Sequence, residues 1–199
     1  MSSRDVILGR VRAALRDAPV VAEVPRDYRP GGLVADLEVL IDRLVDYKAR
    51  VHRVGEDEVA ATVSAIVGEG GAVLVPPGLP EPWRPAGAFP DENLAPDRIA
   101  GADAVLTAAA VAVAETGTIV LDASPDQGRR IITLLPDVHI CVLRADQVVA
   151  TVPDAIARLD PARPLTWISG PSATSDIELN RVEGVHGPRN LHVILLPPG

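Results

Sequence analysis

The sequence is poor in aromatic residues and in cysteine. Aromatic side chains make up 3% of the 199 residues, whereas 47% of the residues are hydrophobic and most of these are aliphatic. We therefore expect layers of aliphatic strands and helices rather than a binding surface rich in aromatic rings. The single cysteine, Cys141, lies in the apolar run 139–143 and is interpreted as a buried strand thiol. One cysteine excludes an internal disulfide and an iron–sulfur cluster held by this chain alone.

Basic clusters and long hydrophobic runs are missing too. The formal net charge is −8, which argues against nucleic acid and anionic membranes as partners. The opening stretch, MSSRDVILGRVRAAL, lacks the apolar core of a signal peptide. No apolar run approaches the length of a membrane span. We expect a soluble, cytoplasmic protein without membrane insertion.

The usual signatures of cofactor and metal binding are also absent from the sequence. The chain contains no G-x-G-x-x-G or P-loop motif, and neither an H-x-x-H nor a C-x-x-C spacing. Carboxylate clusters with metal-ligand spacing are likewise missing. The sequence therefore predicts neither a cofactor nor a metal.

The first 50 residues are expected to form a helical arm. Ser3 is predicted to cap a helix that ends near residue 16, and a proline-marked connection follows over residues 19–32. A second helix is predicted over residues 33–50. The predicted apolar faces comprise Val6, Ile7, Val11 and Leu15 in the first helix, and Leu37, Leu40, Ile41, Leu44 and Val45 in the second. Because no strand precedes either helix, the arm could pack on its own domain or on another chain, as in a homo-oligomer.

From residue 51 onward, strands and helices alternate, which predicts an α/β domain over residues 51–199. The expected strands are 51–54, 72–75, 104–107, 112–114, 118–121, 138–142, 165–169 and 191–196, with helices over 56–67 and 153–159. Such a pattern indicates a sheet covered by helices on both faces, with ligands near the carboxyl ends of the strands. The proline-rich stretch 76–96 is interpreted as a surface loop pinned by Trp83 and Phe89, in preference to a lid.

The first candidate site is the stretch AETGTIVLDAS, residues 114–124. Glu115, Thr116, Gly117 and Thr118 interrupt two apolar segments, so a tight turn or bulge is expected, with Gly117 supplying unusual backbone angles. Such a turn would place a carboxylate beside two hydroxyls and free amides. The alternative is a hairpin turn with a solvated glutamate.

A second candidate is the arginine pair Arg129–Arg130, which follows a glycine and precedes an apolar run. Either guanidinium could clamp a carboxylate or phosphate with two parallel hydrogen bonds. The simpler interpretation is a solvated loop. We select Arg129 as the substrate-binding residue because the apolar run favours its partial burial.

The third candidate is GPSATSDIE, residues 170–178. Ser175 and Glu178 have the spacing of a capping box, which predicts a helix from near Asp176 to just before residue 184. Two acids in its first turn would repel a phosphate. The Ser172 and Thr174 hydroxyls precede this cap and remain available for a ligand or for Glu115.

The fourth candidate is His186, which lies between glycines in the stretch GVHGP. A histidine with little packing around it suits general acid or base chemistry, although a solvated turn histidine would have the same sequence. The other histidines, His52, His139 and His192, lie in strand runs and are interpreted as structural.

Two segments of the chain resemble the lactate-utilisation protein C family, whose members share the LUD domain. They are AETGTIVLDAS followed by GRRIITLLPDVHICVL, and ISGPSATSDIELNRVEGVHGPRNLHVILL, together about 60 residues. The sequence departs from the family at Ala173, where relatives often carry an arginine. If that arginine contacts an anion, Arg129, Arg130 or Arg181 would have to replace it here.

The resemblance implies a three-layer α/β/α sandwich of the ribose-5-phosphate isomerase and CoA-transferase-like type. It also implies a role in oxidising L-lactate to pyruvate alongside iron–sulfur companion proteins, more as a non-redox subunit than as a stand-alone enzyme. The alternative is an acyl-transfer enzyme like the CoA transferases, with Glu115 as nucleophile.

We expect the two glycine turns and the capped helix start to form one shared site, with a small carboxylate as a candidate ligand. We assign Glu115 and His186 as its catalytic groups. The predicted substrate-binding residues are Thr116, Gly117, Thr118, Arg129, Ser172 and Asp176.

Overall fold

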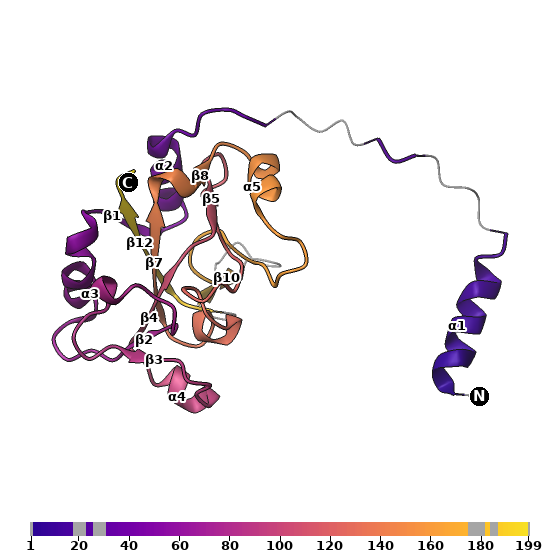
Figure 1. Cartoon of the computed structure of the whole chain (residues 1–199), viewed down its shortest axis with the longest axis horizontal. Helices are drawn as coiled ribbons and strands as arrows, with labels where there is room; N and C mark the ends of the chain where they lie inside the picture. Colours follow the sequence, from indigo (N-terminus) through magenta and orange to yellow (C-terminus); the bar gives the residue numbers. More distant parts are fainter. Residues whose placement is uncertain (1, 18–22, 26–30, 175–181, 184–186, 199) are drawn as a thin grey trace.

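A parallel sheet forms the centre of the protein, whose computed structural model describes residues 2–17, 23–25, 31–174, 182–183 and 187–198. Its six strands have the order β1-β12-β7-β4-β2-β3 and all run parallel (Figure 1). The strands are β1 (Arg50–Arg53), β2 (Val73–Val75), β3 (Phe89–Pro90), β4 (Ala104–Ala108), β7 (Val138–Arg144) and β12 (Asn190–Leu196). The two longest, β7 and β12, are nearly continuous apolar runs, as strands buried on both faces require.

A smaller sheet packs beside the first, with the strand order β8-β5-β6-β9. It comprises β5 (Val111–Val113), β6 (Thr118–Leu121), β8 (Val148–Val149) and β9 (Thr166–Ile168). Strand β6 runs antiparallel to both β5 and β9, and a tight turn joins it directly to β5. A short ribbon pairs β10 (Ala173–Thr174) with β11 (Val182–Glu183).

Helices cover these sheets in layers. They are α2 (Leu37–Asp46), α3 (Val59–Val67), α4 (Pro96–Ala100) and α5 (Val152–Arg158), with 3-10 turns η1 (Glu56–Glu58), η2 (Glu81–Trp83), η3 (Arg130–Thr133) and η4 (Ala145–Gln147). One face of the central sheet packs on α3, and the opposite face packs on α2 and the smaller sheet. Helix α5 covers the far side of the smaller sheet. The predicted fold class, a parallel sheet flanked by helices, is confirmed.

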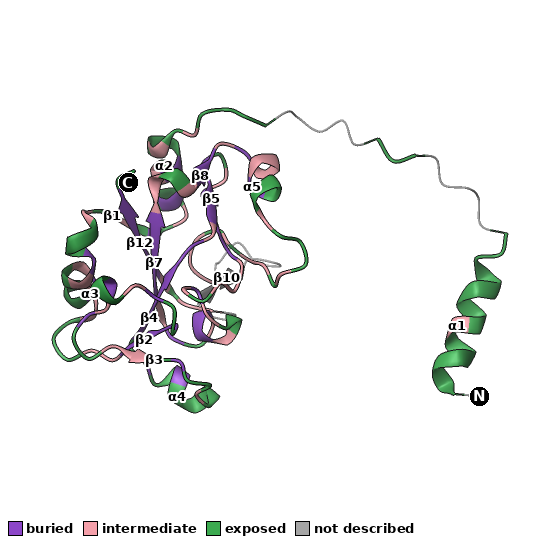
Figure 2. Ribbon diagram, in the orientation of Figure 1, coloured by how far each residue is buried: buried purple, intermediate pink, exposed green. Residues whose placement is uncertain are grey.

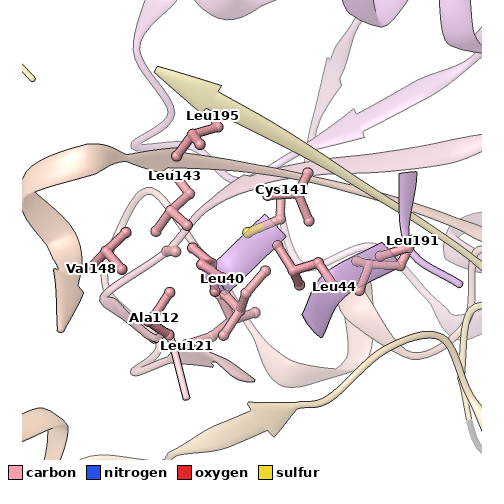
Figure 3. Packing of buried hydrophobic residues seen from close by; sticks show 14 residues of the cluster. Leu40, Leu44, Ala112, Leu121, Cys141, Leu143, Val148, Leu191 and Leu195 are labelled. Atoms are coloured by element: carbon pink, nitrogen blue, oxygen red, sulfur yellow. The ribbon is translucent and has the colours of Figure 1, made fainter. Parts of the chain in front are cut away.

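The alternation of side chains along β7 divides the core into two parts. Cys141 and Leu143 point into the cluster that contains α2, whereas Ile140 and Val142 point to the α3 side. Figure 3 shows the first cluster, in which Leu40 and Leu44 of α2 meet Cys141 and Leu143. Burying aliphatic side chains of this kind stabilises the fold by about 1.5–3 kcal/mol each.

The two N-terminal helices differ in packing. Helix α1 (Ser3–Ala14) contains no buried residue and lies apart from the α/β body (Figure 2). Helix α2, by contrast, packs into the main core through Leu40 and Leu44. It is shorter than predicted, because the Asp36 carboxylate caps its first turn and Lys48, with a φ of 71°, ends it before β1. Val45, which was predicted on the buried face, is exposed.

The prediction of a helix up to residue 183 is wrong at its end. Val182 and Glu183 form β11, whose backbone pairs with β10. The capping residues Ser175 and Glu178 lie outside the described residues. Pairing between two strands satisfies backbone amide groups as a helix would, and the capping-box spacing does not distinguish the two.

The proline-rich stretch 76–96 is anchored to the body. Trp83 is buried, and its ring nitrogen donates a hydrogen bond of 3.1 Å to Glu56 Oε1. The Arg144 guanidinium lies 5.3 Å from the centre of the Trp83 ring.

Over the described residues, no helix is long and apolar enough to cross a bilayer.

Candidate functional site

The Glu115–Thr118 turn connects β5 to β6 and packs against α2. Gly117 has a φ of 61°, and a Cβ added there would lie 2.7 Å from Arg43 Cβ, so both backbone angle and space require glycine. Thr116 Oγ1 donates a hydrogen bond of 2.8 Å to Thr118 Oγ1, which shares another of 2.9 Å with Ser169 Oγ. The hydroxyls of this turn are therefore largely bound within the protein.

The Glu115 side chain is directed toward α5. It is exposed, and its Oε1 accepts a hydrogen bond of 3.2 Å from the amide of Val152, the first residue of α5. Its own amide donates to the Ala150 carbonyl at 3.2 Å. An acid at this position satisfies an amide that the first helical turn leaves unpaired.

The Ser169–Ser172 turn follows β9 and is held from two sides. Gly170 has a φ of 81°, and a Cβ there would lie 2.7 Å from Tyr47 Cβ at the end of α2. The Ser172 amide donates a hydrogen bond of 2.8 Å to the Pro188 carbonyl, just before β12. This turn therefore has a well-defined position between α2 and the start of β12.

A cavity of about 310 Å³ opens beside the Ser169–Ser172 turn, and we call it the Ser172 cavity. It lies between β9 and the amino ends of β7 and β12. Its lining residues are Arg130, Thr133, Leu134, His139, Thr166, Trp167, Ile168, Ser169, Gly170, Pro171, Ser172, Gly187, Pro188 and Leu191. Ser172 does follow the carboxyl end of its own strand, but β9 belongs to the smaller sheet. The cavity therefore lies at the amino ends of the central strands, whereas the sequence predicted a site at their carboxyl ends.

Arg130 carries the charge of this cavity. No carboxylate side chain lies among the described lining residues. The other ionisable group there, His139, is buried, and burial lowers its pKa to about 4, so that it is neutral at neutral pH. Its Nε2 lies 2.9 Å from Thr107 Oγ1. Among the described lining residues, Arg130 is therefore the one with a charged side chain at neutral pH.

Arg129, the residue selected from the sequence, is bound elsewhere. Its Nε donates to Asp91 Oδ2 at 2.7 Å, its Nη2 to Asp91 Oδ1 at 2.5 Å, and Nη2 also to the Leu94 carbonyl at 3.1 Å. The hydrogen bonds from Arg129 hold the pKa of Asp91 below its ordinary value. The bidentate face of Arg129 is therefore occupied by a carboxylate of the protein itself.

The structure brings together only part of the predicted set. Ser172 lines the cavity, and Thr118 is joined to its wall through Ser169. Glu115, Thr116, Gly117 and Arg129 are not among its lining residues. Asp176 and His186 lie outside the described residues.

Thr133 and His139 line the cavity although the sequence did not predict either as a site residue, and Arg130 lines it in place of the predicted Arg129. The arginine pair was visible in the sequence. The partner that separates its two members, Asp91, lies 38 residues away from Arg129. No local signal distinguishes the arginine that reaches Asp91 from the one that reaches the cavity.

A second cavity, of about 470 Å³, lies at the carboxyl ends of β2 and β4. Two carboxylates line it, those of Asp122 and Asp126, together with one guanidinium, that of Arg158. Burial raises the pKa of Asp126, whose Oδ1 has no hydrogen-bond partner among the described residues. Carboxylate walls repel an anionic ligand, so the Ser172 cavity is the better candidate for a small carboxylate.

Comparison with known proteins identifies relatives of this chain. A family model described as the LUD domain matches residues 91–196. Lactate utilization protein C of Deinococcus radiodurans is 50% identical over 162 residues, which covers 78% of this chain and 76% of that protein. Lactate utilization protein C of Bacillus subtilis is 36% identical over 99 residues, covering 46% of this chain and 41% of that protein.

A solved structure shares the fold. The crystal structure of a DUF162 family protein from Deinococcus radiodurans matches with a TM-score of 0.70 and 42% sequence identity. The match covers 80% of this chain and 95% of that chain.

Proposed function

This chain belongs to the LUD domain family, and on that premise we propose that it supports the oxidation of L-lactate to pyruvate together with iron–sulfur companion proteins. Relatives that carry the name Lactate utilization protein C support a role in lactate utilisation. We place this role in the cytoplasm.

The composition of the Ser172 cavity is the observation that carries the proposal. L-Lactate presents a carboxylate, a hydroxyl and a methyl group. Arg130 offers a guanidinium that can bind a carboxylate with two hydrogen bonds. The Ser169 and Ser172 hydroxyls can donate to or accept from the substrate hydroxyl, and Leu134 and Leu191 offer an apolar wall for the methyl group. One cation, hydroxyls and apolar side chains thus line a single cavity.

The redox step is assigned to the companion proteins. Burial raises the pKa of Cys141 to about 12, so its thiol stays protonated at neutral pH. A protonated thiol inside the main core is unsuited to ligate a cluster or to exchange with a disulfide. In this proposal the chain binds and positions the carboxylate, and the companions accept the electrons.

The position of Glu115 does not favour the acyl-transfer alternative. A carboxylate nucleophile must reach an acyl group in a site that excludes water. Glu115 is exposed, its carboxylate accepts the Val152 amide, and it is absent from the walls of both cavities described above. We therefore keep lactate utilisation as the proposed function.

Growth on L-lactate as sole carbon source tests the proposal. A deletion strain should fail on L-lactate and grow normally on pyruvate, and the wild-type gene should restore growth. Arg130→Gln should not restore it, because the amide cannot replace the charge-assisted bonds to a carboxylate. Arg98→Gln, on the exposed surface of α4, is the matched control and should restore growth fully. Normal lactate growth of the deletion strain, with no other lactate dehydrogenase present, would disprove the proposal.

A further inference from the structure

Helix α1 has an apolar stripe that is not covered by the described protein. Val6, Ile7, Val11 and Leu15 are between 40% and 61% exposed. The helix also has a capping box at its start, in which the Asp5 amide donates to Ser2 Oγ at 3.2 Å and the Ser2 amide donates to Asp5 Oδ2 at 3.1 Å. A helix of 12 residues is marginal alone in water. Its stability therefore depends on a surface that receives the stripe.

The charge of α1 indicates what kind of surface that is. Residues 2–16 contain four arginines and one aspartate, a net charge of +3, within a chain whose formal net charge is −8. The remaining residues therefore carry −11. Two α1 helices would repel each other, whereas an acidic surface with an apolar groove would attract one.

The α/β body has an apolar groove with a volume of about 460 Å³, whose described lining includes two carboxylates and one guanidinium. It lies between the start of α2 and the carboxyl ends of β1 and β12. Its walls comprise Leu37, Val54, Leu195, Leu196, Pro197 and Pro198 together with Glu38, Arg53, Gly55 and Glu58. Arg53 is paired with Glu38, which leaves the carboxylate of Glu58 as a further negative charge at the edge. We call this the C-terminal groove.

The connection between α1 and the body favours a groove on another molecule. The Gly32 amide donates a hydrogen bond of 2.7 Å to Asp154 Oδ1, and Asp154 Oδ2 accepts one of 2.6 Å from Thr151 Oγ1. This contact holds the chain against α5 before it continues to α2. Figure 1 shows α1 beyond α5, on the side of the body away from the C-terminus. In this arrangement α1 contributes no residue to the lining of its own C-terminal groove.

We propose that α1 of one copy seats its Ile7, Val11 and Leu15 stripe in the C-terminal groove of a second copy. Reciprocal exchange of two such helices gives a closed, two-fold symmetric dimer. Each contact is small, and the second forms within an already linked pair, which strengthens the assembly.

Disulfide trapping between two different cysteine variants tests whether α1 is exchanged between copies. One sample of full-length protein carries Ile7→Cys and the other Pro198→Cys, an exposed groove position. The native Cys141 is buried and should not react. Mixing the two and oxidising mildly should give a covalent dimer that contains one copy of each. Val34→Cys, at a 94% exposed position outside α1 and the groove, replaces Ile7→Cys in the control and should give at least tenfold less of the mixed dimer.

Two further measurements distinguish exchange of α1 between copies from its binding within one copy. The Val11→Asp variant should raise the dimer dissociation constant at least about tenfold in light scattering, since it places a charge in the apolar stripe. A chain with both Ile7→Cys and Pro198→Cys that closes on itself as a covalent monomer would show that α1 occupies its own groove and would overturn the proposal. A monomeric wild type, or equal yields with Val34→Cys, would overturn it as well.

Discussion

Two glycine turns of this protein start from similar sequences and end in different surroundings. In both, a glycine with positive φ packs against α2, at Arg43 for Gly117 and at Tyr47 for Gly170. The Glu115–Thr118 turn binds its polar groups within the protein, whereas the Ser169–Ser172 turn forms one wall of a cavity. A glycine beside hydroxyls therefore indicates a constrained turn, and only the neighbouring strands decide whether a ligand has room there.

The same difference separates Arg129 from Arg130. The first binds the Asp91 carboxylate with two hydrogen bonds, and the second lines the Ser172 cavity. Adjacent residues of the same type thus have a structural role and a proposed binding role. Substitutions that act on stability in one region and on binding in the other will test this division.

The largest stability loss is expected from Gly117→Ala. The turn would require alanine to adopt a left-handed backbone, and the added Cβ would lie 2.7 Å from Arg43 Cβ. The backbone penalty and the steric contact together should lower the free energy of unfolding by about 2–4 kcal/mol. Chemical denaturation measures this loss directly. Gly87→Ala, which has a φ of 83° and no atom within 4 Å of the added Cβ, is the control for the backbone penalty alone. An equal loss in the two variants would mean that the turn is not packed against α2.

The next effect is the contrast between Arg129→Gln and Arg130→Gln. The first variant leaves the buried Asp91 carboxylate without its cationic partner, so its melting temperature should fall by several degrees. The second should melt within experimental error of the wild type. Because the pKa of Asp91 is lowered in the folded state, its contribution is present above the unfolded pKa and is lost as the pH falls through the folded one. Arg129→Gln should therefore lose less stability on acidification than the wild type. Equal melting temperatures of the two variants would contradict the assignment.

Much of the fold was predictable from the sequence, because a continuous apolar run such as Ile140–Leu143 indicates a buried strand. The structure divides the side chains of this run between the two core clusters. The end of α2 was not predictable, since Lys48 in a left-handed conformation stops a helix that side-chain periodicity alone would continue. The site was predictable only as a list of polar turns. Contacts distant in sequence, such as Asp91 with Arg129, decide which polar side chains line a cavity, and a single sequence does not reveal these contacts.

A smaller effect is expected from pH through His139, in the wall of the Ser172 cavity. Its folded pKa is about 4, below the ordinary value of 6.5, because burial disfavours the imidazolium. Its stabilising contribution is thus complete above pH 6.5 and falls as the pH decreases toward 4. Urea titrations across this range should show the decline, and His139→Gln should reduce it. Part of the decline should persist, because burial also lowers the pKa of His192 to about 4. If stability depended on pH equally steeply in His139→Gln and in the wild type, the His139 imidazole would have to be solvated in the folded protein.

Titration of the purified protein with L-lactate measures the proposed binding directly. Trp167 lines the Ser172 cavity, so its fluorescence should report binding, and calorimetry should give the stoichiometry. The account predicts saturable binding of one L-lactate per chain, weakened about tenfold or more in Arg130→Gln, as expected for the loss of a charge-assisted hydrogen bond of about 1.5–3 kcal/mol. Arg98→Gln should bind as the wild type does. No saturable binding, or an unchanged dissociation constant in Arg130→Gln, would contradict the account.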